Sequence, residues 1–176
     1  MSWEIKIYRT SEPDFSEWRK LYNRLPAKGI YHDPIYIKFL ERHFGNEAEL
    51  FIWADGEEFV YYPYFKRCLR QLPCADQCPI DTSKYYDIIV SWYYGGPIVN
   101  NLNMKPDKLL EFINAFARYA RDNNIVSEFI RYDPNIENHN YFKNLLPIEL
   151  NRQSVFIDLS VSENDIWKNM EGRGRT

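Results

Sequence analysis

Glycine and cysteine are scarce in this sequence, and no long apolar segment interrupts it. Seven glycines in 176 residues exclude a flexible linker or a low-complexity protein. The three cysteines are an odd number, and their C-x5-C-x3-C spacing matches no common zinc pattern, so we expect neither a disulfide framework nor a metal site. No apolar run approaches the ~20 residues that cross a bilayer. The first thirty residues also lack the apolar segment of a secretory signal. We therefore expect a cytoplasmic protein without a membrane span.

Excess positive charge is also absent. The formal charge is −3 and the isoelectric point is about 5.7, so the chain as a whole is not a surface that seeks the phosphates of DNA. Aromatic residues, in contrast, make up 17% of the chain. A disordered chain has far fewer, and this length is enough to bury one core. We expect one globular domain over residues 1–176.

Hydrophobic periodicity predicts alternating strands and helices. Strands are expected at 4–8, 50–54, 59–65, 85–92, 126–132 and 153–159. Helices are expected at 11–26, 33–45, 106–123 and 137–145, and from residue 162 onward. The order is β-α-α-β-β-β-α-β-α-β followed by a helix, which indicates an α/β fold with a mixed sheet between helices.

Four local expectations are specific enough to check. Ser11 is predicted to cap the first helix, with Pro13 in its first turn. In the second helix, which Asp33 opens and Gly45 ends, the apolar residues Ile35, Phe39 and Leu40 are predicted to be buried. Asp55-Gly56 predicts a hairpin turn with positive φ at both positions. Pro63 predicts a sheet edge or a bulge, because proline has no N–H to donate to a ladder.

This order resembles the GNAT acyltransferase fold, and four stretches resemble the first lobe of the Fem-type (FemABX) peptidyltransferases and their GNAT-like relatives. The stretches are Tyr31-His32-Asp33-Pro34; Tyr86-Asp87-Ile88 with Tyr94-Gly95-Gly96-Pro97; Glu128-Phe129-Ile130-Arg131-Tyr132-Asp133-Pro134; and Val155-Phe156-Ile157-Asp158-Leu159-Ser160 with Trp167-Lys168-Asn169-Met170. They extend over nearly the whole chain.

The resemblance implies a transferase that moves an acyl or aminoacyl group onto an amine. The donor substrate is acyl-CoA in GNAT-like relatives and aminoacyl-tRNA in Fem-type enzymes, whose acceptor is a cell-wall peptide precursor. No tightly bound cofactor is implied. Such enzymes have two lobes, so we expect this chain to stop before the second lobe, which would contact tRNA. We also expect the isolated chain to self-associate through the surface left uncovered.

Two alternatives remain open. GNAT enzymes that bind CoA have a Q/R-x-x-G-x-G/A loop, in which backbone N–H groups hold the pyrophosphate. The matching junction, 92–106, contains Gly95 and Gly96 but not the full pattern. This departure favours a lobe that binds the acceptor. The alternatives are a non-catalytic or truncated binding lobe and, with less support, a complete single-lobe acetyltransferase.

Several candidate substrate-binding residues cluster in the second stretch of the resemblance. Gly95 and Gly96 follow a central strand, where a backbone without Cβ atoms allows a ligand to approach closely. A plain tight turn explains them equally well. Tyr93 and Tyr94 flank the turn and offer rings and hydroxyls to an acceptor, although such aromatics are more often packing residues.

Tyr31, His32 and Arg131 complete the candidate set. Arg131 offers a bidentate fork to a carboxylate or phosphate, and its plainer role is a structural salt bridge. His32 has the ordinary pKa of a general base, and its plainer role is that of a surface residue before a helix. Direct transfer to an amine needs no covalent nucleophile, so we assign no catalytic residue.

Overall fold

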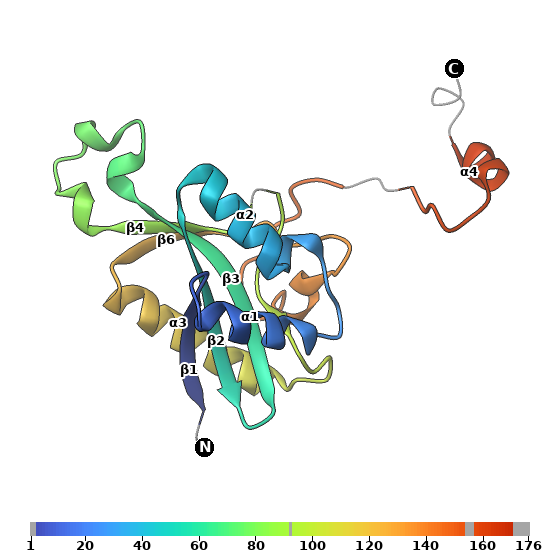
Figure 1. Cartoon of the computed structure of the whole chain (residues 1–176), viewed down its shortest axis with the longest axis horizontal. Coiled ribbons are helices and arrows are strands. Elements are labelled where there is room, and N and C mark those ends of the chain that lie inside the picture. The colour runs from blue at the N-terminus through green and yellow to red at the C-terminus, as the bar shows by residue number, and fades with distance from the viewer. Residues whose placement is uncertain (1–2, 92, 154–156, 171–176) are drawn as a thin grey trace.

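The fold is built on a mixed six-stranded sheet (Figure 1). The computed structural model describes residues 3–91, 93–153 and 157–170. In that part the strand order is β1-β2-β3-β4-β6, with β5 paired to β3. Neighbours are antiparallel except β4 and β6, which are parallel. The strands are β1 (Glu4–Arg9), β2 (Glu47–Asp55), β3 (Glu58–Cys68), β4 (Tyr86–Ile89), β5 (Ile98–Val99) and β6 (Ile125–Phe129). The expected mixed α/β sheet is confirmed.

Helices cover both faces of the sheet. The helices α1 (Asp14–Asn23) and α2 (Pro34–Phe44) lie on one face, and α3 (Pro106–Asp122) lies on the other (Figure 1). Two hydrophobic cores result, because β2 and β3 are buried on both sides and send alternate side chains to each core. None of the helices in the described ranges is long and apolar enough to cross a membrane.

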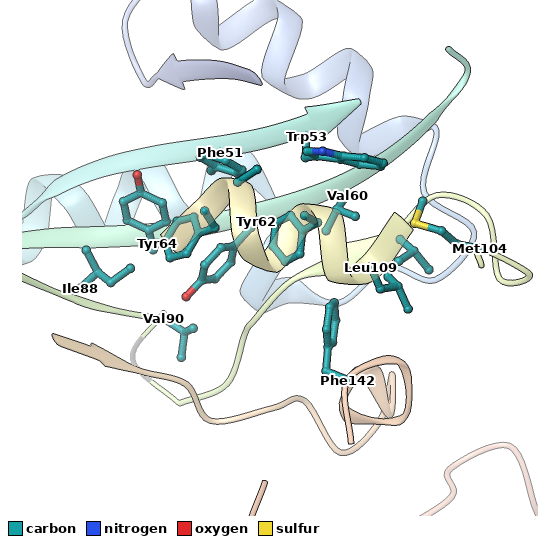
Figure 2. Close-up of a cluster of buried hydrophobic side chains, with 14 of the residues drawn as sticks. Phe51, Trp53, Val60, Tyr62, Tyr64, Ile88, Val90, Met104, Leu109 and Phe142 are labelled. Carbon is teal, nitrogen blue, oxygen red and sulfur yellow. The ribbon is translucent and has the colours of Figure 1, made fainter. Parts of the chain in front are cut away.

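The core on the α3 side is an aromatic assembly (Figure 2). Phe51 on β2 meets Phe112 and Phe116 of α3 edge-on, at ring-centroid distances of 6.0 and 5.0 Å. Tyr62 of β3 lies 5.1 Å from the Phe116 ring. Edge-to-face contacts of this kind stabilise a core by about 0.5–1.5 kcal/mol per pair beyond the area they bury. They fix α3 across the centre of the sheet.

The predicted hairpin joins β2 to β3, one residue further along than expected. The last pair of the ladder is Asp55 with Glu58, so Gly56 and Glu57 form the turn. Gly56 has φ of +62°, and Asp55 lacks the positive φ that we predicted. Asp55 instead ends the strand, because the hairpin needs glycine only at its first central position.

Pro63 lies in an interior strand but at a local edge, because one side of β3 has no partner there in the described ladders; the predicted edge is therefore confirmed at this position, and no bulge forms. Its ladder with Leu50 of β2 continues without a register shift. On its other side β3 pairs with β4 through residues 65–68 and with β5 through residues 60 and 61. Pro63 falls in the gap between these partners, where β3 needs no donor. The chain between β4 and β5 leaves the sheet here and returns where Gly95 bridges Tyr132.

The caps of α2 follow the sequence, but its buried face and the cap of α1 do not. The Asp33 carboxylate accepts from the Ile35 N–H, and Gly45 ends the helix at φ +72°. Ile35 and Phe39 are each 59% exposed, while Leu40 is buried as expected. Apolar residues lie on two sides of α2, and Pro34, Ile37 and Leu40 are those that face the sheet. In α1, Pro13 occupies the cap position and no side chain caps the helix, so the prediction for Ser11 is wrong.

Elements toward the C-terminus are shorter than predicted. The strand expected at 126–132 is β6, which ends at Phe129. The strand expected at 85–92 is β4, which ends at Ile89, and Trp92 lies outside the described residues. In the expected strand 153–159, Gln153 and residues 157–159 are not in a strand, and 154–156 lie outside the described residues. The helix expected at 137–145 is a short 3-10 turn, η5 (Asn138–Tyr141). The last helix, α4 (Glu163–Asn169), has the predicted Ser162 cap.

Replacing Tyr61 with Phe tests how much one buried hydrogen-bond relay stabilises the fold. The Trp18 indole N–H donates to the Tyr61 hydroxyl (2.6 Å), which donates to the His32 carbonyl (2.8 Å). Tyr61→Phe leaves both partners buried and unpaired, which costs about 1–3 kcal/mol. Urea denaturation should show this loss. The control Tyr36→Phe removes a hydroxyl with no hydrogen bond to the described residues, and equal midpoints for the two variants would contradict the relay.

Candidate functional site

Three segments far apart in the sequence meet beside the start of α2. They are the 3-10 turn η1 (Ile30–His32), the glycine loop 93–97 and the segment 131–138 that follows β6. The backbone N–H of Gly95 donates to the Arg131 carbonyl (2.9 Å), which joins the second segment to the third. Three of the four stretches singled out in the sequence therefore contribute to one place. We refer to it as the loop site.

The tyrosines of the loop site form a cluster around Tyr31. The Tyr31 ring lies 5.4 Å from the Tyr94 ring, edge-on, and 6.3 Å from the Tyr93 ring. Tyr93 is 52% exposed, so its ring faces solvent as well as Tyr31. Burial raises the pKa of Tyr31, and the neighbouring Tyr36 hydroxyl and Asp133 carboxylate raise it further. Tyr31 thus contacts both of the other predicted tyrosines and also Tyr36 of α2.

His32 is fully buried, so the prediction of a surface residue is wrong. Its Nε2 lies 3.0 Å from the Gly96 carbonyl oxygen, and since a carbonyl only accepts, Nε2 carries the proton. Nδ1 is therefore the unprotonated nitrogen, and it has no hydrogen-bond partner among the described residues. Burial lowers the pKa of His32 to about 4, against the opposing effects of the Gly96 carbonyl and Asp133. A neutral His32 with this pKa positions the glycine loop and is a weak base at neutral pH.

Gly95 and Gly96 are required by packing. A Cβ on Gly95 would lie 2.7 Å from the Val90 Cβ, which is closer than two carbon atoms can approach. Gly96 has φ of +88°, a conformation that is costly for residues with a Cβ. Both backbones lie close to protein atoms, which supports the tight-turn interpretation. Trp92, just before the loop, lies outside the described residues.

Asn138 and Asp133 are site residues that sequence reasoning did not single out. Asn138 is buried, and its amide N–H groups donate to the carbonyls of Gly95 (2.8 Å) and Pro97 (3.1 Å). Its side-chain oxygen accepts from the Asp133 N–H (3.0 Å). Asp133 is 1% exposed, and its carboxylate accepts from the Asn135 N–H (2.9 Å). The only sequence signal was Asp133-Pro134 followed by Asn138, five residues after the aspartate. It did not reveal the site, because Gly95 and Pro97, which Asn138 binds, lie 43 and 41 residues away.

An open pocket of about 410 Å³ adjoins this network. Residues 27–31 form one wall, and Asp133, Asn135 and Ile136 form the other. Gly29 is packed closely against the base: a Cβ there would lie 2.9 Å from the Asp133 carboxylate and from Ile136 Cδ1, and 3.7 Å from His32 Nδ1. Tyr31 thus lines the pocket and also belongs to the tyrosine cluster. A carboxylate, a ring and a glycine backbone meet at one accessible hollow.

Arg131 is apart from the pocket. Its guanidinium lies 5.9 Å from the Phe129 ring, and the residue is exposed. Within the described ranges it makes no ion pair, so the plainer role of a structural salt bridge is not seen there, and its binding of a ligand's carboxylate or phosphate stays a prediction. Glu128, on the other face of the chain, accepts from the buried Tyr62 hydroxyl (2.5 Å), and desolvation of its carboxylate raises its pKa.

The cysteines and acids offer no metal site in the part of the chain that the structure describes. No group of three His, Cys, Asp or Glu side chains is arranged to hold an ion among those residues. Cys68 is partly buried, and Cys74 and Cys78 are exposed, all as free thiols.

Comparison with protein-family models, with curated proteins and with solved structures gives no match. The chemistry of the loop site is therefore judged from its own residues.

Replacing His32 tests the acid sensitivity that its burial creates. The folded-state pKa of about 4 lies below the ordinary value of 6.5, so the unfolded chain binds the proton more tightly. The His32 contribution to stability is complete above pH 6.5 and is lost as the pH falls toward 4, by up to about 3 kcal/mol. We expect His32→Gln, whose amide can still donate to Gly96, to lose less stability between pH 7 and pH 4.5 than the parent.

Urea denaturation at both pH values measures this difference. His43→Gln is the matched control, because it removes an exposed histidine from the same part of the molecule. Parallel pH profiles for the parent and His32→Gln would show that burial of His32 does not set the acid sensitivity.

Proposed function

We propose that this chain is the acceptor-binding lobe of an N-acyltransferase or aminoacyltransferase with a GNAT-like fold, related to the Fem-type enzymes. The observation that supports it most is the pocket beside Tyr31, with the Asp133 carboxylate at its base. Three stretches that resemble the Fem-type first lobe form this pocket and its supporting loop. We infer that the ligand of the pocket is the amine that receives the acyl group.

The sheet is compatible with this assignment. Four antiparallel strands, β1 to β4, are followed by α3 and a parallel strand, β6. This succession agrees with the order that led to the GNAT comparison, as far as β6. The glycine loop leaves the sheet between β4 and β5, at the carboxyl end of β4, where ligands bind in many α/β folds.

An amine suits the chemistry of the pocket. An ammonium group is attracted to a carboxylate and to a tyrosine ring, and Asp133 and Tyr31 both line the pocket. The Lys28 ammonium, on the same wall, donates to the Asn23 carbonyl (2.9 Å). A partly enclosed pocket strengthens the attraction to the carboxylate, because the local dielectric constant is below that of water. Acceptors of the proposed class include a primary amine on a cell-wall peptide precursor.

The start of α3 favours placing the donor outside this lobe. Lys108, in the first turn, forms ion pairs with Asp55 (2.6 Å) and Glu58 (2.5 Å). Two carboxylates therefore neighbour a side chain of the first turn of α3, which disfavours binding of a pyrophosphate at the start of this helix. Acyl-CoA or aminoacyl-tRNA would then reach the amine from a second lobe, in the cytoplasm where both donors are made. Orientation and carbonyl polarisation, without a covalent nucleophile, suffice for such a transfer.

A non-catalytic binding lobe is the second candidate. It is favoured by the pKa of about 4 of His32, since the buried histidine closest to the pocket is a weak base at neutral pH. The binding prediction below applies to both candidates. Transfer of a labelled aminoacyl or acetyl group to an amine by the full-length protein separates them.

The pocket is tested by titrating the protein with n-butylamine and with n-butanol, which is nearly isosteric and uncharged. We expect saturable NMR shift changes at residues 27–31 and 133–136 with the amine only. Asp133→Asn should weaken amine binding about tenfold, the effect of losing roughly 1.4 kcal/mol of attraction to a charged partner.

Asp158→Asn is the matched control. The exposed Asp158 accepts from the N–H two residues ahead (2.9 Å), as Asp133 does, but lies outside the pocket. Equal binding of butanol and butylamine, or unchanged amine affinity in Asp133→Asn, would overturn the proposed amine pocket.

A further inference from the structure

The outer face of α2 is an uncovered apolar surface. Ile35 and Phe39, one turn apart, are each 59% exposed, although α2 already buries a separate face against the sheet. Ring contacts continue along the helix from Tyr36 through Phe39 and His43 to Phe44. An apolar row of this kind on a folded domain marks an interaction surface. Its length, about three helical turns, fits another helix.

Helix α4 is an amphipathic helix that the body of the domain does not cover. Trp167 is 54% exposed, and the preceding residues Leu159 and Val161 are 82% and 42% exposed. Ile166, Trp167 and Met170 line an open hollow on its surface. The helix has seven residues and lies away from the sheet and its helices (Figure 1). A helix this short is marginal in water unless its apolar side packs against something.

Charge favours pairing these two surfaces. The segment that contains α4 carries the acids Asp158, Glu163 and Asp165, of which Glu163 and Asp165 lie in its first turn. On α2, Arg42 is exposed and makes no ion pair within the described ranges, and His43 lies next to it in the last turn. The C-terminal end of α2 is thus positively charged, and the N-terminal end of α4 is negatively charged. Antiparallel packing of α4 on α2 places Arg42 and His43 beside Glu163 and Asp165, so opposite charges meet at the rim of the contact.

We propose that two copies of this chain associate by exchanging α4, so that α4 of each copy packs on the outer face of α2 of the other. The two contacts are identical, as a two-fold dimer requires. A second copy is the occupant because α4 lies away from its own α2 (Figure 1), while Phe39 and Trp167 are both more than half exposed in every copy. This inference does not depend on the proposed function.

Complementation between two variants tests the exchange. Phe39→Ser removes the largest exposed ring from the α2 surface and leaves α4 intact, and Trp167→Ser does the reverse. Both side chains are more than half exposed, so both variants should fold. We expect each variant alone to dimerise at least about tenfold more weakly than the parent in analytical ultracentrifugation. An equimolar mixture should dimerise more strongly than either variant, because it restores one intact contact.

Ile80→Ser is the matched control, since Ile80 is 56% exposed at a distant loop and its loss should leave dimerisation unchanged. A parent chain that stays monomeric at its highest attainable concentration would overturn the proposal. A mixture that dimerises no better than its components would also overturn the proposal. Contacts between like surfaces, or α4 folding back on its own chain, give that result. The difference in emission between the parent and Trp167→Ser reports on Trp167, and a blue shift of this difference that is independent of concentration would identify folding back.

Discussion

A chain of buried hydrogen bonds from α1 to the glycine loop is the constraint on which the candidate site depends. It runs from the Trp18 indole to the Tyr61 hydroxyl, on to the His32 carbonyl, and from the His32 ring to the Gly96 carbonyl. Each donor and acceptor is out of reach of water, so each needs its partner to be in place. The helix α1, strand β3 and the start of α2 are thereby held in one arrangement relative to the loop.

Asn138 extends the same constraint to the segment after β6. It holds the Gly95 and Pro97 carbonyls and the Asp133 N–H, so the loop is clamped between His32 on one side and Asn138 on the other. The Asp133 carboxylate is left at the base of the pocket, fixed by the backbone and not by a cation. A carboxylate placed in this way is positioned for a ligand of the pocket, which is the basis of the proposed amine site.

Local signals in the sequence predicted the features that local chemistry determines. The Asp33 and Ser162 caps, the glycine that ends α2 and the long stripe of α3 depend on residues within one or two turns. The buried face of α2 was predicted wrongly, because apolar residues on two sides leave its rotation undetermined until the sheet is present. The roles of His32 and Asn138 were unpredictable for a similar reason: their partners lie 64 and 43 residues away.

The exposed apolar face of α2, which was expected to be buried, also connects the site to the outer surface. Ile35 and Phe39 were expected in the core, since apolar residues are normally buried, and their exposure means that a second apolar face serves another contact. Tyr36 touches Phe39 on one side and Tyr31 on the other, at ring-centroid distances of 6.4 and 6.2 Å. Tyr31 in turn lines the pocket. A partner helix on Phe39 would therefore lie two rings from the proposed amine, and its binding would restrict the motion of the tyrosine that borders the ligand.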